Sequence, residues 1–175
     1  MPDGTGKIEF KQLSAFTTEN YITHPISGEY SKYFIKDDLF AGGDYFLKSI
    51  AEIFINNGYD VTVSECTMLH NSTFEHLIVE QLGLVFITGN FFNGLVPENE
   101  NIINFSRFYD KEMYSNKKQR INFDKKASLE LAKEASVCLK TALDIHEELE
   151  KFYINAIDFE SLNHFTAEFI ESLKK

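Results

Sequence analysis

The sequence predicts a single α/β domain in which helices cover a parallel sheet. The first half of the chain alternates short strand signals with a helix signal, and its strands are nearly continuous apolar runs, which is typical of strands buried on both faces. The second half carries long helical periodicity. A length of 175 residues suits one domain, and a hydrophobic content of 43% is enough for its core. We expect the α/β region over about 8–106 and a mainly helical region over about 107–175.

An acidic turn joins the first expected strand to the first expected helix. Residues 32–36 are aromatic and β-branched and predict a short buried strand. The turn occupies 37–44 (Asp-Asp-Leu-Phe-Ala-Gly-Gly-Asp) and opens a helix of about 13 residues. Asn56-Asn57-Gly58 is expected to end that helix, because glycine readily takes the left-handed conformation of a C-terminal cap. The apolar side of the helix consists of Phe46, Leu47, Ile50, Ile53 and Phe54.

Two further strands complete the expected sheet. Residues 60–66 form one of them. Val79 and the apolar run 82–88 form the other, which ends at Gly89-Asn90. A strand, a helix and two more strands with apolar faces are typical of a parallel sheet covered by helices.

The helical region is expected to contain two helices. Residues 104–116 show no clear period, and a long helix is predicted from beyond Ile121 to about Ala156. Asp158 suits the N-cap of a final helix. The long helix carries a heptad seam with small residues in its middle: Leu131, Ala135, Cys138, Ala142, Ile145, Leu149 and Phe152. The final helix has Leu162, Phe165, Phe169 and Leu173 on one side. Either an internal helical hairpin or core packing explains the seam, or another chain covers it.

Charge and composition exclude several classes of protein. The net charge of −10, from 17 Lys and Arg against 27 Asp and Glu, argues against nucleic-acid binding, which needs a basic surface. Residues 1–10 lack the apolar part of a secretory signal, and the longest apolar run, 82–88, is too short to span a membrane. We therefore expect a cytoplasmic protein that binds neither nucleic acid nor membranes, with Cys66 and Cys138 as reduced core residues.

Catalytic and metal-binding patterns are weak. The five histidines have no paired helical spacing, and the G-x-S-x-G pattern is missing. Cys66, His70 and His76 match no standard zinc spacing. We predict no catalytic residue and no metal site. A small ligand, if any, is expected in the crevice at the carboxyl ends of the strands. The crevice would be lined by Ser64, Glu65, Cys66 and Thr67, beside Gly42, Gly43, Thr88 and Asn90.

The turn at 37–44 stands where nucleotide-binding proteins hold phosphate. Backbone N–H groups and the positive helix end cradle the phosphates, a lysine reaches their oxygens, and a Ser or Thr hydroxyl holds magnesium, in the pattern G-x-x-x-x-G-K-[ST]. In the frame 38–44 the second glycine is Gly42. Asp38 stands at the first glycine, Gly43 at the lysine and Asp44 at the hydroxyl.

Several segments carry a resemblance to a protein family. They are residues 13–21, 33–36, 57–61, 80–89, 104–110 and, most distinctively, 145–160. Over about 9–170 the chain resembles a family of uncharacterised bacterial P-loop proteins, predicted ATPases built from two related P-loop halves. The chain is similar to one half, more to the second. The resemblance implies a three-layer P-loop NTPase-like fold with a parallel sheet and long C-terminal helices.

The same resemblance shows where the chain departs from the family. The strand 84–88 is similar to the Walker B strand, but Thr88 stands where an acid is expected. Glu75 corresponds to an acidic position in the family's loop after the second strand, and Cys66 to a cysteine at the end of that strand. The positions of a degenerate phosphate site are therefore Asp38, Gly42, Gly43, Asp44 and Thr88.

These departures predict a domain that does not hydrolyse ATP and that acts as a binding or assembly module. The missing lysine removes a positive charge, and the aspartates add negative ones. Two like charges 4 Å apart repel by roughly 4 kcal/mol at an effective dielectric near 20. Such repulsion weakens binding about a thousandfold. A lone half is expected to recover its interface as a homodimer or by pairing with an intact P-loop homologue.

Other interpretations of the turn remain open at this point. In one, the domain is a nucleotide-binding ATPase or kinase-like enzyme in which Mg²⁺ bridges Asp37, Asp38 or Asp44 to phosphate, and only then are ATP and magnesium cofactors. In another, the domain is a small-molecule sensor that uses the crevice without phosphates. In the simplest, the turn is solvated and Asp44 caps the helix. Lys36 or Lys48 could replace the missing lysine, whereas the two arginines, Arg107 and Arg120, are expected in surface ion pairs.

Overall fold

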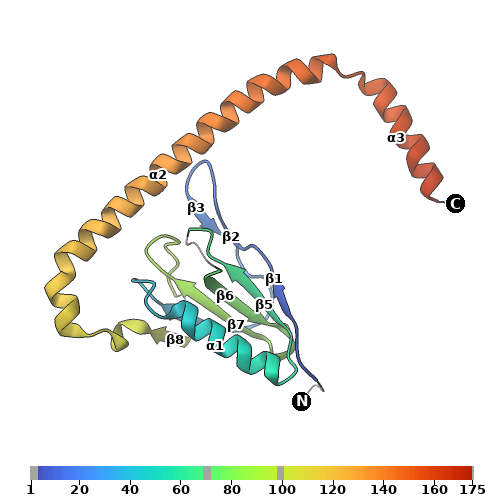
Figure 1. Cartoon of the computed structure of the whole chain (residues 1–175). Helices are drawn as coiled ribbons and strands as arrows, with labels where there is room; N and C mark the ends of the chain where they lie inside the picture. Colours follow the sequence, from blue (N-terminus) through green and yellow to red (C-terminus); the bar gives the residue numbers. More distant parts are fainter. Residues whose placement is uncertain (1–3, 69–71, 98–100, 175) are drawn as a thin grey trace.

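The computed structural model describes residues 4–68, 72–97 and 101–174. The main sheet has six strands: β1 (Ile8–Phe10), β4 (Ser31–Lys36), β5 (Val61–Glu65), β6 (Phe74–Val79), β7 (Leu84–Gly89) and β8 (Asn101–Asn104). Their order is β1-β5-β6-β7-β4-β8 (Figure 1). β6 pairs antiparallel with both of its neighbours, and the other five strands run in one direction. The fold class is therefore α/β, with a mostly parallel sheet.

A second sheet and the helices complete the described chain. β2 (Ser14–Phe16) and β3 (Tyr21–Thr23) form a separate antiparallel pair. The helices are α1 (Gly43–Asn56), α2 (Lys111–Ala156) and α3 (Phe159–Leu173), and the 3-10 turns are η1 (Glu80–Leu82) and η2 (Phe105–Phe108). Figure 1 shows α1 lying along the main sheet. We call the two sheets together with α1 the body. The outer part of α2 leaves the body and turns into α3.

The predicted strand, turn and helix are confirmed. β4 covers the expected 32–36, and α1 begins at Gly43 inside the turn and ends at Asn56. Gly58 follows with φ of +82°, the left-handed conformation expected after the helix. β5 lies within the predicted 60–66. β4 pairs with β7 on one side and with β8 on the other, so the turn follows an inner strand of the sheet and not an edge strand.

The prediction of a single strand from Val79 and residues 82–88 is wrong, because these residues belong to two strands. β6 ends at Val79, and β7 begins at Leu84 after η1 and Gly83, whose φ of +59° helps the chain to reverse. β6 is the antiparallel strand of the sheet. The strands β1, β2, β3 and β8 have only three or four residues each and carry too little pattern to be recognised in the sequence.

Different elements cover the two faces of the main sheet. On one face Leu47 and Ala51 of α1 pack with Ile35, Val63 and other strand residues in the larger core cluster. On the opposite face the smaller cluster joins the strand residues to Leu13, Ile26 and Tyr30. In the described chain this second cover comes from the segment that holds β2 and β3, and not from the second helical layer that the three-layer expectation requires.

The long helix starts earlier than predicted. Asp110 caps α2, since its Oδ1 accepts the Met113 N–H at 2.9 Å, so the helix begins at Lys111 instead of beyond Ile121. Its end at Ala156 and the cap at Asp158 are confirmed. Within the part of the chain that the structure describes, no helix is long and apolar enough to cross a membrane.

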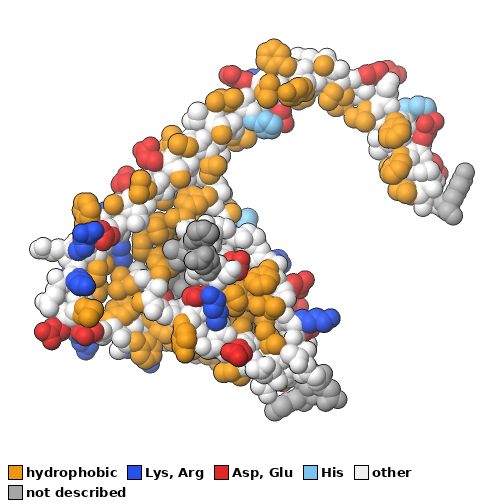
Figure 2. Space-filling view, viewed as in Figure 1, with side chains coloured by type: hydrophobic (Ala, Val, Ile, Leu, Met, Phe, Trp, Pro, Cys, Tyr) orange, Lys and Arg blue, Asp and Glu red, His pale blue; other side chains and the backbone are white. Residues whose placement is uncertain are grey.

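Every residue from 137 to 174 is exposed, and we call this segment the arm. The arm comprises the outer part of α2 and all of α3, and Figure 2 shows hydrophobic side chains along it, away from the body. The expected internal hairpin or core packing of the seam is therefore wrong for the described chain. Cys66 is buried, but Cys138 is exposed on the arm and is not a core residue.

Candidate functional site

The turn between β4 and α1 wraps around the side chain of Asp37. Its Oδ1 accepts the Ala41 N–H at 3.0 Å, and its Oδ2 accepts the N–H groups of Gly42 at 3.1 Å and Gly43 at 2.7 Å. These are donors that a phosphate would use at the start of a helix. We call the N–H groups of Ala41, Gly42 and Gly43 the cradle. The protein has therefore filled the cradle with its own carboxylate, that of Asp37.

Burial and backbone conformation hold Asp37 in the cradle. Its side chain is 1% exposed, so the negative charge depends on the N–H groups and on the positive end of α1. Phe40 takes a φ of +53°, an uncommon conformation for a bulky residue, which curls the turn back over Asp37. The Phe40 ring packs edge-on against Phe91, with ring centroids 5.4 Å apart.

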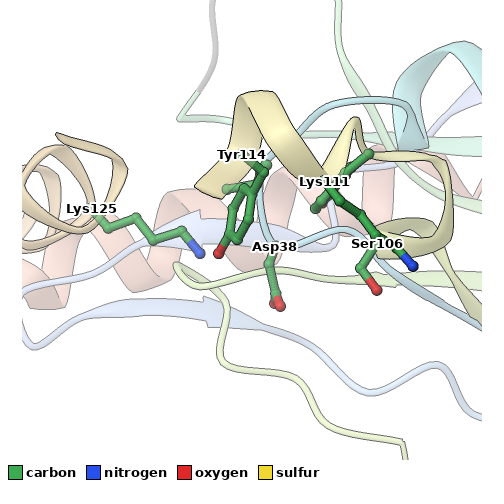
Figure 3. Close-up of a pocket in the computed structure, with 7 residues that line it drawn as sticks. Asp38, Ser106, Lys111, Tyr114 and Lys125 are labelled. Atoms are coloured by element: carbon green, nitrogen blue, oxygen red, sulfur yellow. The ribbon is translucent and has the colours of Figure 1, made fainter. Parts of the chain in front are cut away.

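A recount of the motif corrects its expected alignment. Counting back from Gly42 over four intervening residues places the first glycine of the motif at Asp37, and not at Asp38. Asp38 is half-buried and points elsewhere, into a pocket of about 250 Å³ between the turn and the start of α2. Figure 3 shows Lys125 and Tyr114 of α2 pointing toward one another in this pocket, while the Lys111 amine turns away.

Gly43 is closely packed against the bound carboxylate. A Cβ at Gly43 would lie 3.0 Å from Asp37 Oδ2 and 3.5 Å from the Thr88 methyl group. The position aligned with the P-loop lysine is therefore tight for any side chain while Asp37 fills the cradle. At Gly42 a Cβ would meet nothing within 4 Å.

Asp44 does not cap α1, contrary to the simplest interpretation of the turn. The N-cap is Gly42, which has no capping side chain. Asp44 Oδ1 instead accepts the Phe74 N–H at 2.8 Å and ties α1 to β6, while Asp44 also pairs with Lys48 at 2.9 Å. Lys48 is thereby directed toward Asp44 and lies over the Phe74 ring. Arg120 pairs with Asp124 on α2, as expected of a surface arginine.

The space between the turn and the residues of β6 and β7 is small. A cavity of about 20 Å³ is lined by residues of the turn, β6 and β7, and its size matches about one water molecule. Its lining includes five predicted crevice or site positions: Gly43, Asp44, Cys66, Thr88 and Asn90. Thr88 Oγ1 is buried without a hydrogen-bond partner. The structure thus brings these residues together, while Asp38 lies outside the cavity.

A buried carboxylate lies on the other side of this cavity. Glu75 is 2% exposed, and it accepts hydrogen bonds from the Tyr21 hydroxyl at 3.1 Å and the Asn93 amide at 3.0 Å. Burial, and after it the charge of Glu75, raises the pKa of Tyr21, which keeps the phenol protonated as a donor. The Asn93 amide also donates to the Thr88 carbonyl. Glu75 therefore joins β6 to β3 and to the loop after β7.

His76 is the neighbour of Glu75 and is fully buried. Its Nδ1 accepts the Thr88 N–H at 3.3 Å, and its Nε2 lies 3.4 Å from Ser14 Oγ and 3.6 Å from Glu75 Oε2. Burial lowers the pKa of His76 more than Glu75 raises it, so the ring is neutral at pH 7. His70 lies outside the described residues, and no group of three metal-binding side chains occurs within them.

Sequence reasoning missed two parts of this arrangement. It treated Asp37 as one of three similar aspartates, although its place at the first residue after β4 was a usable signal. It assigned Glu75 to a loop, whereas Glu75 lies on β6 and its partners Tyr21 and Asn93 come from distant segments. Comparison of the chain with protein-family models, curated proteins and solved structures gives no match.

Proposed function

We propose that this is a degenerate P-loop NTPase-like domain that does not hydrolyse ATP and that serves as a binding or assembly module. The observation that carries the proposal is the Asp37 carboxylate, which accepts three N–H groups at the start of α1. Hydrolysis needs a lysine and a magnesium ligand beside the phosphates. The aligned positions hold Gly43 and Thr88 instead.

Electrostatics supports the closed cradle. A phosphate that approached the turn would meet Asp37 at the donors it needs, and like charges 4 Å apart repel by roughly 4 kcal/mol at an effective dielectric of 20. To bind, the phosphate would have to displace a buried carboxylate that already has three charge-assisted hydrogen bonds. The Mg²⁺-bridged alternative draws on Asp37, Asp38 or Asp44. The side chains of Asp37 and Asp44 already accept backbone N–H groups, and Asp38 lines the neighbouring pocket instead.

The arm supports the assembly part of the proposal. Exposed apolar surface of this extent on a helix is typical of a face that another chain covers. The alternative sensor function draws on the crevice at the carboxyl ends of the strands, where the cavity lined by Cys66, Thr88 and Asn90 has room for only about one water molecule. In the separate pocket beside Asp38, the two lysines do not converge (Figure 3).

Thermal melting with Mg-ATP, Mg-GTP and free magnesium tests the closed cradle. A ligand present at 100 times its dissociation constant stabilises the native state by about 2.7 kcal/mol, so binding gives a measurable shift. We expect no shift for the wild type. Asp37→Gly, which empties the cradle, is expected to gain a phosphate-dependent shift, whereas Asp38→Gly is not. A magnesium-dependent nucleotide shift of the wild type would favour the enzyme.

A further inference from the structure

The arm and the adjoining part of α2 expose more apolar surface than an isolated chain usually tolerates. Sixteen large hydrophobic side chains from Leu131 to Leu173 are 42–75% exposed. Monomeric proteins rarely show apolar patches larger than a few hundred Å². A stable dimer buries about 800 Å² per partner, from about 20–30 residues. α2 alone has 46 residues, which is enough for an interface of this class.

The spacing of the seam residues on α2 is typical of a helix–helix interface. Its residues follow a spacing of four and three from Leu131 to Phe152, which keeps them on one side of the helix. Leu131, Ile145 and Phe152 on this side are 71%, 63% and 75% exposed. Ala135 and Ala142 lie between them, and their small side chains let a second backbone approach closely.

Charge is distributed unequally along the same helix. A basic segment near its start, residues 117–126, contains Lys117, Lys118, Arg120, Lys125 and Lys126 with one acid, Asp124. An acidic segment farther along, residues 144–150, contains Asp144, Glu147, Glu148 and Glu150 without Lys or Arg. Two parallel copies of α2 would set like charges beside each other, whereas two antiparallel copies set the basic segment of each beside the acidic segment of the other.

We propose that α2 packs antiparallel against α2 of a second copy of this chain, about a two-fold axis near residue 133. In this register Leu131 faces the partner's Ala135, and the basic segment lies beside the partner's acidic segment. The heptad spacing then sets Arg120 next to the partner's Glu148. Both contacts occur twice, as a two-fold interface requires. The inference rests on the proposed assembly function and names its partner.

The mass of the full chain in solution tests this inference first. Sedimentation and light scattering at micromolar concentration are expected to give twice the chain mass of 20.2 kDa. The variant Leu131→Glu/Ile145→Glu is expected to be monomeric. Val137→Glu is the matched control, because Val137 is exposed on the same helix but outside the seam, and it is expected to stay dimeric. A monomeric wild type would overturn the proposal.

Charge reversal tests the orientation at exposed positions that are not needed for folding. Arg120→Glu and Glu148→Lys alone are each expected to weaken the dimer at least tenfold, and the double variant is expected to restore it. Lys126→Glu makes the same charge change on the side of α2 away from the seam and serves as the control. A double variant that is no tighter than the single ones would overturn the antiparallel arrangement. Nucleotide binding by the wild type would overturn the closed cradle but would leave the dimer mass unchanged.

Discussion

At the scale of single residues, the proposed function depends on Asp37, whose carboxylate occupies the N–H donors of the turn before α1. A carboxylate oxygen and a phosphate oxygen need the same N–H donors, so the residue that satisfies those donors also excludes the ligand. The side chain is also part of the fold, because without it the buried N–H of Gly43 has no partner. Binding and stability at this turn therefore depend on one side chain.

Replacement of Asp37 is expected to destabilise the domain. Asp37→Asn removes the charge and one acceptor oxygen, and the loss of charge-assisted hydrogen bonds is expected to cost about 2–3 kcal/mol in the free energy of unfolding. Asp38→Asn is the matched control, with an expected change of less than about 0.5 kcal/mol. Urea unfolding of the two variants measures the difference. Equal effects would show that the cradle contacts do not stabilise the turn.

The buried His76 predicts a loss of stability in acid. Burial lowers the pKa of His76 below its ordinary value of 6.5, so unfolding takes up a proton once the pH falls below that value. The stabilisation is complete above pH 6.5 and is lost progressively below it. We expect the melting temperature to fall as the pH decreases below about 6.5.

Two histidine variants isolate this contribution. His76→Asn keeps an acceptor for the Thr88 N–H but does not titrate, so the dependence of melting temperature on pH is expected to become shallower. His164→Asn is the control, because His164 is exposed on α3. If both variants keep the wild-type pH dependence, His76 is not its source.

The composition of the turn did not single out Asp37 among its neighbours. Asp37, Asp38 and Asp44 look alike as acidic residues, and before the backbone is known only the place of Asp37 directly after β4 sets it apart. The positive φ of Phe40 turns the loop back toward Asp37, and the start of β6 gives Asp44 a different partner. Long-range contacts of this kind leave no periodic signal in the sequence.

At the scale of elements, the apolar pattern of the sequence predicted helices and strands most accurately where a segment is long and apolar. β4, α1 and β5 were predicted close to their observed bounds because apolar periodicity and a glycine stop agree there. β6 was missed because Glu75 and His76 interrupt its apolar pattern, and only the tertiary network satisfies them. The early start of α2 was missed although Asp110 is a good N-cap residue.

The cap of α3 can be tested separately from the body. Asp158 accepts the N–H groups of Glu160 and Ser161, and the hydrogen bonds from Ser161 hold the pKa of Asp158 below its usual range. Asp158→Ala is expected to increase amide hydrogen exchange in the first turns of α3. Asp144→Ala, within the C-terminal third of α2, is the control. Unchanged exchange in α3 would show that other contacts hold the helix.

At the scale of the whole molecule, the body and the arm differ in how they are stabilised. The body buries two apolar clusters on the faces of its sheet, whereas the arm buries nothing within the described chain. The sequence predicted the α/β class from local pattern, and it left open whether the seam is internal or intermolecular. Whether the seam packs within the chain or against another chain depends on the direction of α2 after it leaves the sheet. The periodicity of the sequence does not predict that direction.

The most direct test of the central claim follows the amide signals of Gly42 and Gly43 by NMR while millimolar Mg-ATP or inorganic phosphate is added. These N–H groups donate to Asp37, so they report on the cradle itself. We predict that both signals stay unchanged in the wild type and move only in Asp37→Gly. A saturable shift of either signal in the wild type would contradict the account.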